Sequence, residues 1–200
     1  AELASLRVVL DRKPAIKSPF ETMAAAMIGR SFVKEWNIEE LSRATRRGLK
    51  NRDFDRGRRM FASAGCFACH RFNNEGGMTG PDLTSSGGRY SPHDLLDQII
   101  NPSRVINEQY VPTELTLEGD KTVTGVIVNL FGDEVMVNTD MFDPNQQVKI
   151  DRNKVLRIEP SKTSPMPTGL LTMLKEDEIL DLVAYILSGG DRKNGMFKLR

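Results

Sequence analysis

Cysteine, histidine and tryptophan are scarce in this chain, whose 200 residues include two, two and one of them respectively. The cysteines, Cys66 and Cys69, are separated by two residues, which leaves none for a disulfide across the fold. No apolar run approaches the roughly 18 residues that span a bilayer, so we expect no transmembrane segment in this chain. Residues 1–10 lack the basic-then-apolar pattern of a signal peptide, and we expect any export signal to have been removed or to lie outside this sequence.

An excess of charge of one sign is also missing, because 28 basic residues stand against 27 acidic ones. This balance gives no general reason to expect nucleic acid or an acidic membrane surface as a partner. The hydrophobic content of 39% is enough for a core, and the length predicts one large domain or two small ones. We therefore expect a folded, soluble chain whose partners are recognised by local features.

The stretch AGCFACHRF, residues 64–72, contains both cysteines and His70, and three interpretations compete for it. A thioredoxin-like dithiol requires a strand-to-helix junction, but the preceding residues 53–65 have the apolar spacing of a helix. A zinc site requires four convergent ligands, and only His93 and carboxylates remain to complete it. Haem c requires two thioether links and an adjacent axial histidine, which is the order of a CxxCH motif. Haem c is the favoured interpretation, and the other two stay open.

The loop after His70 has the features that a haem-ligating histidine needs. Such a histidine usually bonds its second ring nitrogen to a carbonyl, which fixes the plane of the ring. Pro81 follows His70 by eleven residues and is our candidate for that carbonyl, an ordinary turn proline being the alternative. The intervening NNEGGMTG is rich in glycine, which suits close wrapping of backbone against a flat ligand.

A sixth iron ligand is sought among nine methionines, most of which we expect to fill the core. Met166 differs because it stands between two prolines in SPMPTGLL, which stiffen its loop. Met78, in GGMTGP, is the main rival. His93 ranks third, because Ser91 and its neighbours predict a helix start that leaves His93 facing solvent.

Four separated motifs resemble a known family: GRRMFASAGCFACHRF, GPDLTSSGGRYSPHDLLDQIINPSRVI, SPMPTGLL and EILDLVAYILSGG. Together they are similar to the haem-binding, class I-like c-type cytochrome domain of large exported proteins in planctomycetes and verrucomicrobia. The resemblance runs from about Asp53 to Gly190. It implies one covalent haem c, with iron, on Cys66 and Cys69. It also implies His70 and Met166 as axial ligands, the carbonyl of Pro81 as partner of His70, and Arg89 and Tyr90 near the haem propionates.

The function implied by this resemblance is one-electron transfer, by an electron-transfer protein or a domain of a larger redox enzyme. The expected partners are an exported dehydrogenase as donor and a respiratory cytochrome or oxidase as acceptor. Haem c is attached outside the cytoplasm, so a periplasmic or otherwise exported location follows. Two other functions stay open: a gas sensor or peroxidase-like site if the sixth position of iron is free, and a partner-docking module formed by a β insertion.

That insertion is predicted because His70 and Met166 are 96 residues apart, too far for a small cytochrome. Residues 113–160 have a β pattern throughout, with five short strands separated by turns, and without them the interval falls to 48 residues. The predicted fold class is therefore a mainly α cytochrome c-like fold with an inserted small antiparallel β-barrel or sheet, α+β overall. The predicted divisions are an N-terminal helical extension (1–50), a discontinuous cytochrome c core (51–111 and 161–190), an inserted β subdomain (112–160) and a C-terminal tail (191–200).

Apolar spacing predicts helices over residues 2–10, 21–36, 37–49, 53–65, 92–100 and 176–190. The resemblance to cytochromes c implies that the fourth and the last of these helices cross, with Gly57, Phe61 and Tyr185 well placed at the crossing. A basic stretch overlaps the third and fourth helices and comprises Arg43, Arg46, Arg47, Lys50, Arg52, Arg56, Arg58 and Arg59. A solvated helix face is the favoured interpretation of this stretch, and a docking patch for an acidic redox partner is the alternative.

Overall fold

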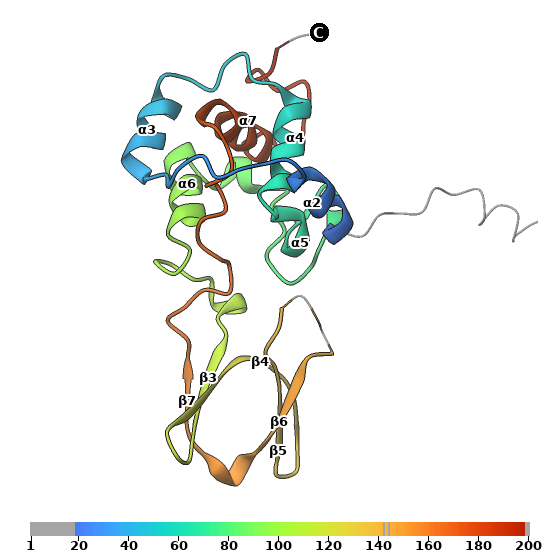
Figure 1. Cartoon of the computed structure of the whole chain (residues 1–200), viewed down its shortest axis with the longest axis vertical. Helices are drawn as coiled ribbons and strands as arrows, with labels where there is room; N and C mark the ends of the chain where they lie inside the picture. The colour runs from blue at the N-terminus through green and yellow to red at the C-terminus, as the bar shows by residue number, and fades with distance from the viewer. Residues whose placement is uncertain (1–18, 142, 144, 199–200) are drawn as a thin grey trace, which may run out of the picture.

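The chain folds into a helical part and a β part that lie end to end (Figure 1). The structure is a computed structural model that describes residues 19–141, 143 and 145–198. The helix predicted over residues 2–10 lies outside the described residues. Helix and strand are both well represented, so the predicted α+β class is confirmed.

The helical part contains α2 (Pro19–Met27), α3 (Ile38–Arg46), α4 (Phe54–Ser63), α5 (Cys66–Cys69), α6 (Pro92–Ile100) and α7 (Glu176–Leu187). Side-chain caps start three of these helices, because Asn37, Asp53 and Ser91 accept hydrogen bonds from backbone N–H groups three residues ahead. Short 3₁₀ helices join the elements: η1 (Ser86–Gly88), η2 (Glu108–Tyr110) and η3 (Arg152–Lys154). The predictions for α3, α4, α6 and α7 are confirmed within a few residues at their ends.

The helix predicted over residues 21–36 is wrong in its second half. α2 ends at Met27, and Gly29 follows with a φ of +75°, a left-handed conformation that ends helices. Residues 30–36 instead form an extended segment, which we call the strap. Its Val33 N–H donates to the carbonyl of Thr172 (2.8 Å), and the Trp36 Nε1–H donates to that of Leu174 (3.0 Å). Hydrogen bonds to a distant part of the chain therefore replace those of the predicted helix.

The crossing of α4 and α7 forms the centre of the helical core, as predicted. A Cβ atom on Gly57 would clash with the carbonyl oxygen of Asp181, so only glycine allows the two backbones to come this close. Phe61 is fully buried, and its ring centroid lies 5.9 Å from that of Tyr185. Edge-on aromatic contacts of this kind add to the stabilisation from burial.

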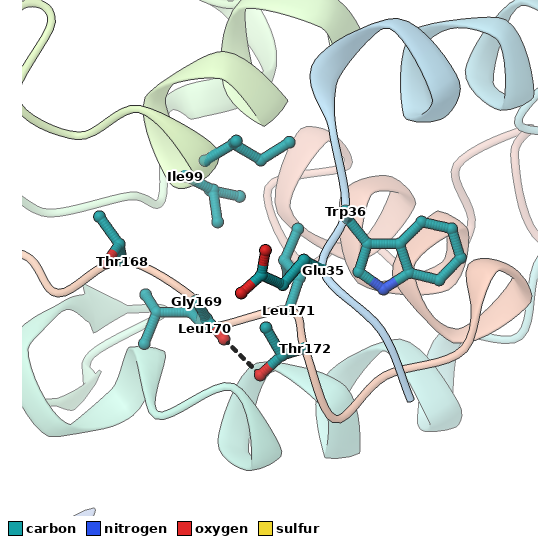
Figure 2. Close-up of a pocket in the computed structure, with 9 residues that line it drawn as sticks. Glu35, Trp36, Ile99, Thr168, Gly169, Leu170, Leu171 and Thr172 are labelled. Carbon is teal, nitrogen blue, oxygen red and sulfur yellow. Dashed lines mark hydrogen bonds between the residues drawn. The ribbon is translucent and has the colours of Figure 1, made fainter. Parts of the chain in front are cut away.

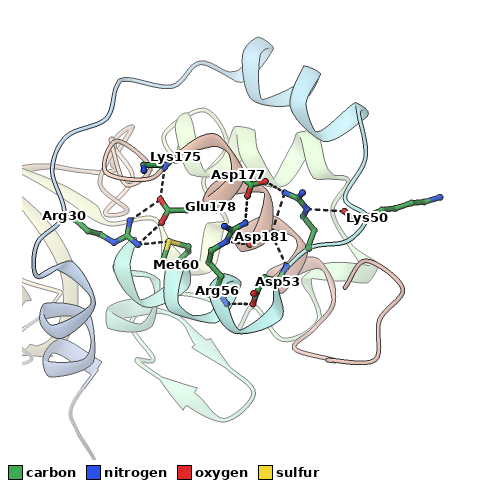
Figure 3. Close-up of polar contacts among 10 residues, drawn as sticks. Arg30, Lys50, Asp53, Arg56, Met60, Lys175, Asp177, Glu178 and Asp181 are labelled. Atoms are coloured by element: carbon green, nitrogen blue, oxygen red, sulfur yellow. Dashed lines mark hydrogen bonds and ion pairs between the residues drawn. The ribbon is translucent and has the colours of Figure 1, made fainter. Parts of the chain in front are cut away.

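The basic stretch differs from the solvated face that the sequence indicated. Arg56 is hydrogen-bonded to the buried carboxylate of Asp181 and to Asp177 at the start of α7 (Figure 3). Arg52 also pairs with Asp177 at 2.8 Å, and this hydrogen bond, despite partial burial, holds the pKa of that carboxyl below its usual value. Half of the stretch is ion-paired within the molecule: Arg47 and Arg58 are the other two members with acidic partners. Arg52 and Arg56 tie the start of α4 to α7, and the four ion pairs together leave fewer charges for an external partner.

The β part is a five-stranded antiparallel sheet made of β3 (Thr113–Leu117), β4 (Lys121–Phe131), β5 (Glu134–Asn138), β6 (Gln147–Asp151) and β7 (Val155–Pro160). All five predicted strands are confirmed. Their order is β6-β5-β4-β3-β7, so β6 and β7 lie at opposite edges of the sheet and no closed barrel forms. The sheet has a small core of its own, made of four buried side chains: Leu115, Val135, Val137 and Ile150.

The two ends of the β part lie next to each other. Thr113 pairs with Pro160 across β3 and β7, and the Ser161 N–H donates to the carbonyl of Pro112 at 2.8 Å. The chain therefore leaves the helical part and re-enters it at one place. Residues 161–175 then run up past α6 to the start of α7 (Figure 1).

Candidate functional site

The two cysteines lie on one short helix. α5 begins directly after Gly65, whose φ of +75° turns the chain sharply away from α4. Residues three apart share a face of a helix, so the sulfurs of Cys66 and Cys69 lie on the same side of this turn. Both cysteines are free and half-buried. The arrangement presents two thiols together at the edge of the helical core.

His70 ends this helix and is held in place by the loop that follows. Its backbone is extended, and its Nδ1 atom lies 2.9 Å from the carbonyl oxygen of Pro81. A carbonyl only accepts, so Nδ1 carries the hydrogen and Nε2 keeps a free lone pair. Burial lowers the pKa of His70, against the smaller opposing effect of this hydrogen bond. The imidazole is therefore neutral near pH 7 and suited to bind a metal through Nε2.

Glycines let the loop approach α5 and His70 closely. The N–H of Gly77 donates to the carbonyl of Phe67 at 2.8 Å, and that of Gly80 donates to Cys69 at 2.9 Å. A Cβ atom on Gly80 would lie 3.0 Å from Nδ1 of His70, closer than side chains normally pack. The glycines thus allow the backbone to cover the side of the imidazole that carries Nδ1.

Met166 lies at the border of the core to which Cys66 also belongs. Both side chains are partly buried, and both pack against the helical core together with Leu83 and Ile100. Segments before and after the β part therefore both contribute to the helical core.

The two rival ligands lie elsewhere. Met78 is 77% exposed, in the same loop whose Pro81 carbonyl bonds Nδ1 of His70. Because Nε2 points away from Nδ1, the Pro81 carbonyl lies on the opposite side of the imidazole from any metal bound at Nε2. His93 is exposed on α6, and its Nδ1 lies 2.7 Å from the Ser42 hydroxyl of α3. In Figure 1, α3 and α5 lie on opposite sides of the helical part.

Arg89 and Tyr90 are exposed on the segment between η1 and α6. Their backbone N–H groups both donate to the carbonyl of Ser86, which continues the turn of η1. Within the described residues, neither side chain makes a hydrogen bond to the segment 66–70. The structure therefore leaves both side chains free of the cysteine helix.

The two alternative interpretations of the cysteines lose support from their surroundings. Burial raises the pKa of the Cys66 thiol to about 12 and also raises that of Cys69. Reactive dithiols need the opposite shift, because the thiolate is the nucleophile. Within residues 19–141, 143 and 145–198, no three histidine, cysteine, aspartate or glutamate side chains come close enough together to hold a metal ion. Neither a thiol switch nor a zinc site fits this environment.

Sequence reasoning missed the cleft that borders the segment after Met166. It has a volume of about 280 Å³, and its walls come from the strap, from the end of α6 and from residues 168–172 (Figure 2). Glu35 and Trp36 of the strap line the cleft together with Ile99 and Ile100 of α6. No local signal in the sequence connects the strap with residues 168–172, because the contact joins segments more than 130 residues apart.

The comparisons with known proteins agree with this geometry. Residues 54–115 match the family model described as Cytochrome c. This match supports a c-type cytochrome domain. It covers α4, the cysteine helix, His70 and Pro81, and ends in β3 before Met166 is reached. No curated protein gives a match to the chain.

A cytochrome c domain implies covalently bound haem c with its iron, electron transfer and redox partner proteins. Such domains are typically electron carriers. Among the described residues, no helix is both long and apolar enough to cross a membrane.

Proposed function

We propose that this chain is a monohaem c-type cytochrome of the planctomycete and verrucomicrobial type, with a mainly α cytochrome c-like fold. Cys66 and Cys69 would hold the haem through thioethers, and His70 and Met166 would be the axial ligands. The observation that carries the proposal is the 2.9 Å hydrogen bond between Nδ1 of His70 and the carbonyl of Pro81. It orients a neutral imidazole next to two thiols on one helix face, which is the donor set that haem c requires.

The residues present fit haem c in further respects. Both thiols are free and lie on one side of α5, glycines allow backbone to approach closely, and partly buried apolar side chains such as Leu83 and Ile100 pack against the helical core. Haem iron, when bound, supplies a reversible one-electron change between the ferric and ferrous states. The chain contributes attachment through Cys66 and Cys69, orientation of His70 and exclusion of water. The thioether of Met166 would favour the ferrous state and raise the reduction potential.

The wider setting follows from this assignment. The haem domain would consist of residues 51–111 and 161–190, with residues 112–160 inserted into it, residues 1–50 as a helical extension and residues 191–200 as a tail. We infer an exported, periplasmic location, because haem c is attached outside the cytoplasm. An exported dehydrogenase would be the donor, and a respiratory cytochrome or oxidase the acceptor. Arg89 and Tyr90, exposed and polar, would approach the haem propionates.

An absorption spectrum of protein matured in a bacterial periplasm tests the proposal. We expect the haem to stay with the chain after denaturation and acid extraction, and the reduced pyridine complex to show the spectrum of two thioether links. Cys66→Ala should shift that spectrum toward the single-link form. A wild-type chain from which all haem is extracted would contradict the proposal.

The β part supports a second candidate function, that of a partner-docking module. It exposes several large apolar side chains on strands: Val126, Val128, Leu130, Phe131, Leu156 and Ile158. Exposed apolar groups gathered on one unit are typical of interaction surfaces. Such a surface would bring a redox partner to the haem domain without changing the haem site.

Replacing residues 113–160 by a short glycine-containing turn separates the two functions. Pro112 and Ser161 are already joined by a 2.8 Å hydrogen bond, so a short turn can close the gap. We expect the haem content per chain and reduction by ascorbate to be unchanged, while reduction by the physiological donor slows. Loss of covalent haem in this variant would show instead that the β part belongs to the haem site.

A further inference from the structure

We propose that Ser103 and Ser164 form a latch that positions Met166 for iron ligation. The inference rests on the proposed function, because it concerns the sixth ligand of the proposed haem. The latch joins the turn after α6 to the loop that follows the β part. It consists of two hydrogen bonds, and each of them uses a backbone N–H of the methionine loop.

The methionine loop, Ser164-Pro165-Met166-Pro167, offers only two backbone donors, because proline has no N–H. Both are used by the latch. The Ser164 N–H donates to the hydroxyl oxygen of Ser103 at 3.0 Å, and the Met166 N–H donates to the hydroxyl oxygen of Ser164 at 3.1 Å. The two prolines fix φ on either side of Met166. The loop therefore has its torsions restricted by proline and its donors bound by serine, which leaves the backbone of Met166 little freedom.

The turn that carries Ser103 is itself fixed by a buried carboxylate. Asp97 lies in α6 with 1% of its surface exposed, and its Oδ1 accepts a hydrogen bond from the side chain of Asn101 at 2.9 Å. Its Oδ2 is ion-paired with Arg104. A buried charge is stable only when its oxygens are bonded, so Asp97 holds residues 101–104 in one conformation. Ser103 thus presents its hydroxyl from a rigid turn.

The latch has no other evident purpose in the fold. The hydrogen bond between Ser103 and Ser164 spans 61 residues of sequence, including the whole β part. In the loop that it fixes, the partly buried apolar residue other than proline is Met166. Residues that orient a metal ligand in this way commonly change the ligand's affinity by about tenfold or more when they are replaced.

Competition with a free ligand, carried out on the matured holoprotein, measures how much the latch strengthens the bond from Met166 to iron. Imidazole binds ferric iron by displacing the methionine, so its apparent Kd reports the strength of the bond from Met166 to iron. We expect Ser164→Ala and Ser103→Ala each to lower this Kd by about tenfold and to weaken the ferric iron–methionine charge-transfer band. Ser164→Thr keeps the hydroxyl and should restore both. Ser85→Ala is the matched control, because Ser85 is exposed and makes no side-chain cap bond.

Three outcomes are distinguishable. An unchanged imidazole Kd in both alanine variants, with a normal band in the wild type, would overturn the latch and leave the proposed function intact. A wild type without covalent haem, or a Met166→Ala variant that keeps the band, would overturn the ligand assignment itself. Equal melting temperatures for Ser164→Ala and Ser85→Ala, together with the tenfold change in Kd, would support positioning over general stabilisation.

Discussion

Replacing Met166 by alanine is expected to abolish the iron–methionine charge-transfer band and to lower the reduction potential by on the order of 0.1 V, within the roughly 0.8 V that axial ligands span. The physical reason is the loss of a soft thioether that favours ferrous iron. Met78→Ala is the matched control and should leave both quantities unchanged. Met78 is 77% exposed and lies in the loop on the Nδ1 side of His70. Absorption of the ferric protein and a potentiometric titration provide the measurements.

Carbon monoxide binding by the wild type and by the Met166→Ala variant decides between a closed and an open iron site. We expect the reduced wild type to bind no carbon monoxide without denaturant, and the reduced Met166→Ala variant to bind it. Binding by the wild type would favour the sensor or peroxidase-like function instead. Loss of the band in Met78→Ala with its retention in Met166→Ala would reverse the ligand assignment.

Replacing His70 by alanine should reduce the covalent haem per chain by an order of magnitude or more, because even a residue that only orients a ligand is worth about tenfold or more. His93→Ala is the natural comparison, since these are the only two histidines in the sequence. It removes a 2.7 Å hydrogen bond to Ser42 and should cost about 1 kcal/mol of stability with normal haem content. The ratio of haem absorbance to protein, measured after purification under denaturing conditions, distinguishes the two variants.

An equal fall of haem content in both histidine variants would indicate that the cause is a folding defect and not the loss of an iron ligand. Melting curves of the two proteins check this. A normal haem content in His70→Ala would contradict the assignment of His70, whatever the behaviour of His93→Ala.

The parts of the fold that follow from local signals could be predicted from the sequence. Asn37 and Ser91 mark helix starts because their side chains bond to N–H groups within the same turn. The strands of the β part follow from alternation and turn residues over short windows. The loop to Pro81 belongs to the same class, because the hydrogen bonds that hold it to α5 and His70 join residues no more than eleven positions apart.

The parts that depend on distant partners could not be predicted in this way. The strap has the composition of a helix, yet its donors bond to carbonyls beyond Met166. Arg56 belongs to a basic stretch that suggests a solvated face, yet its partner Asp181 is 125 residues away and fully buried. Whether the sheet closes into a barrel could not be predicted either, since strand patterns do not show whether β6 and β7 meet; in the structure they lie at opposite edges. In each case a tertiary contact decides the outcome against a local preference.

The sequence separations within the site also bear on the order in which it forms. His70 and Pro81 are 11 residues apart, whereas Trp36 of the strap reaches Leu174 across 138 residues. The entropy lost on closing a loop grows with its length, and this difference corresponds to about 2 kcal/mol. We therefore expect contacts between near neighbours to be made first during folding. The chain would then acquire the half of the proposed site that attaches haem before the half that supplies the methionine.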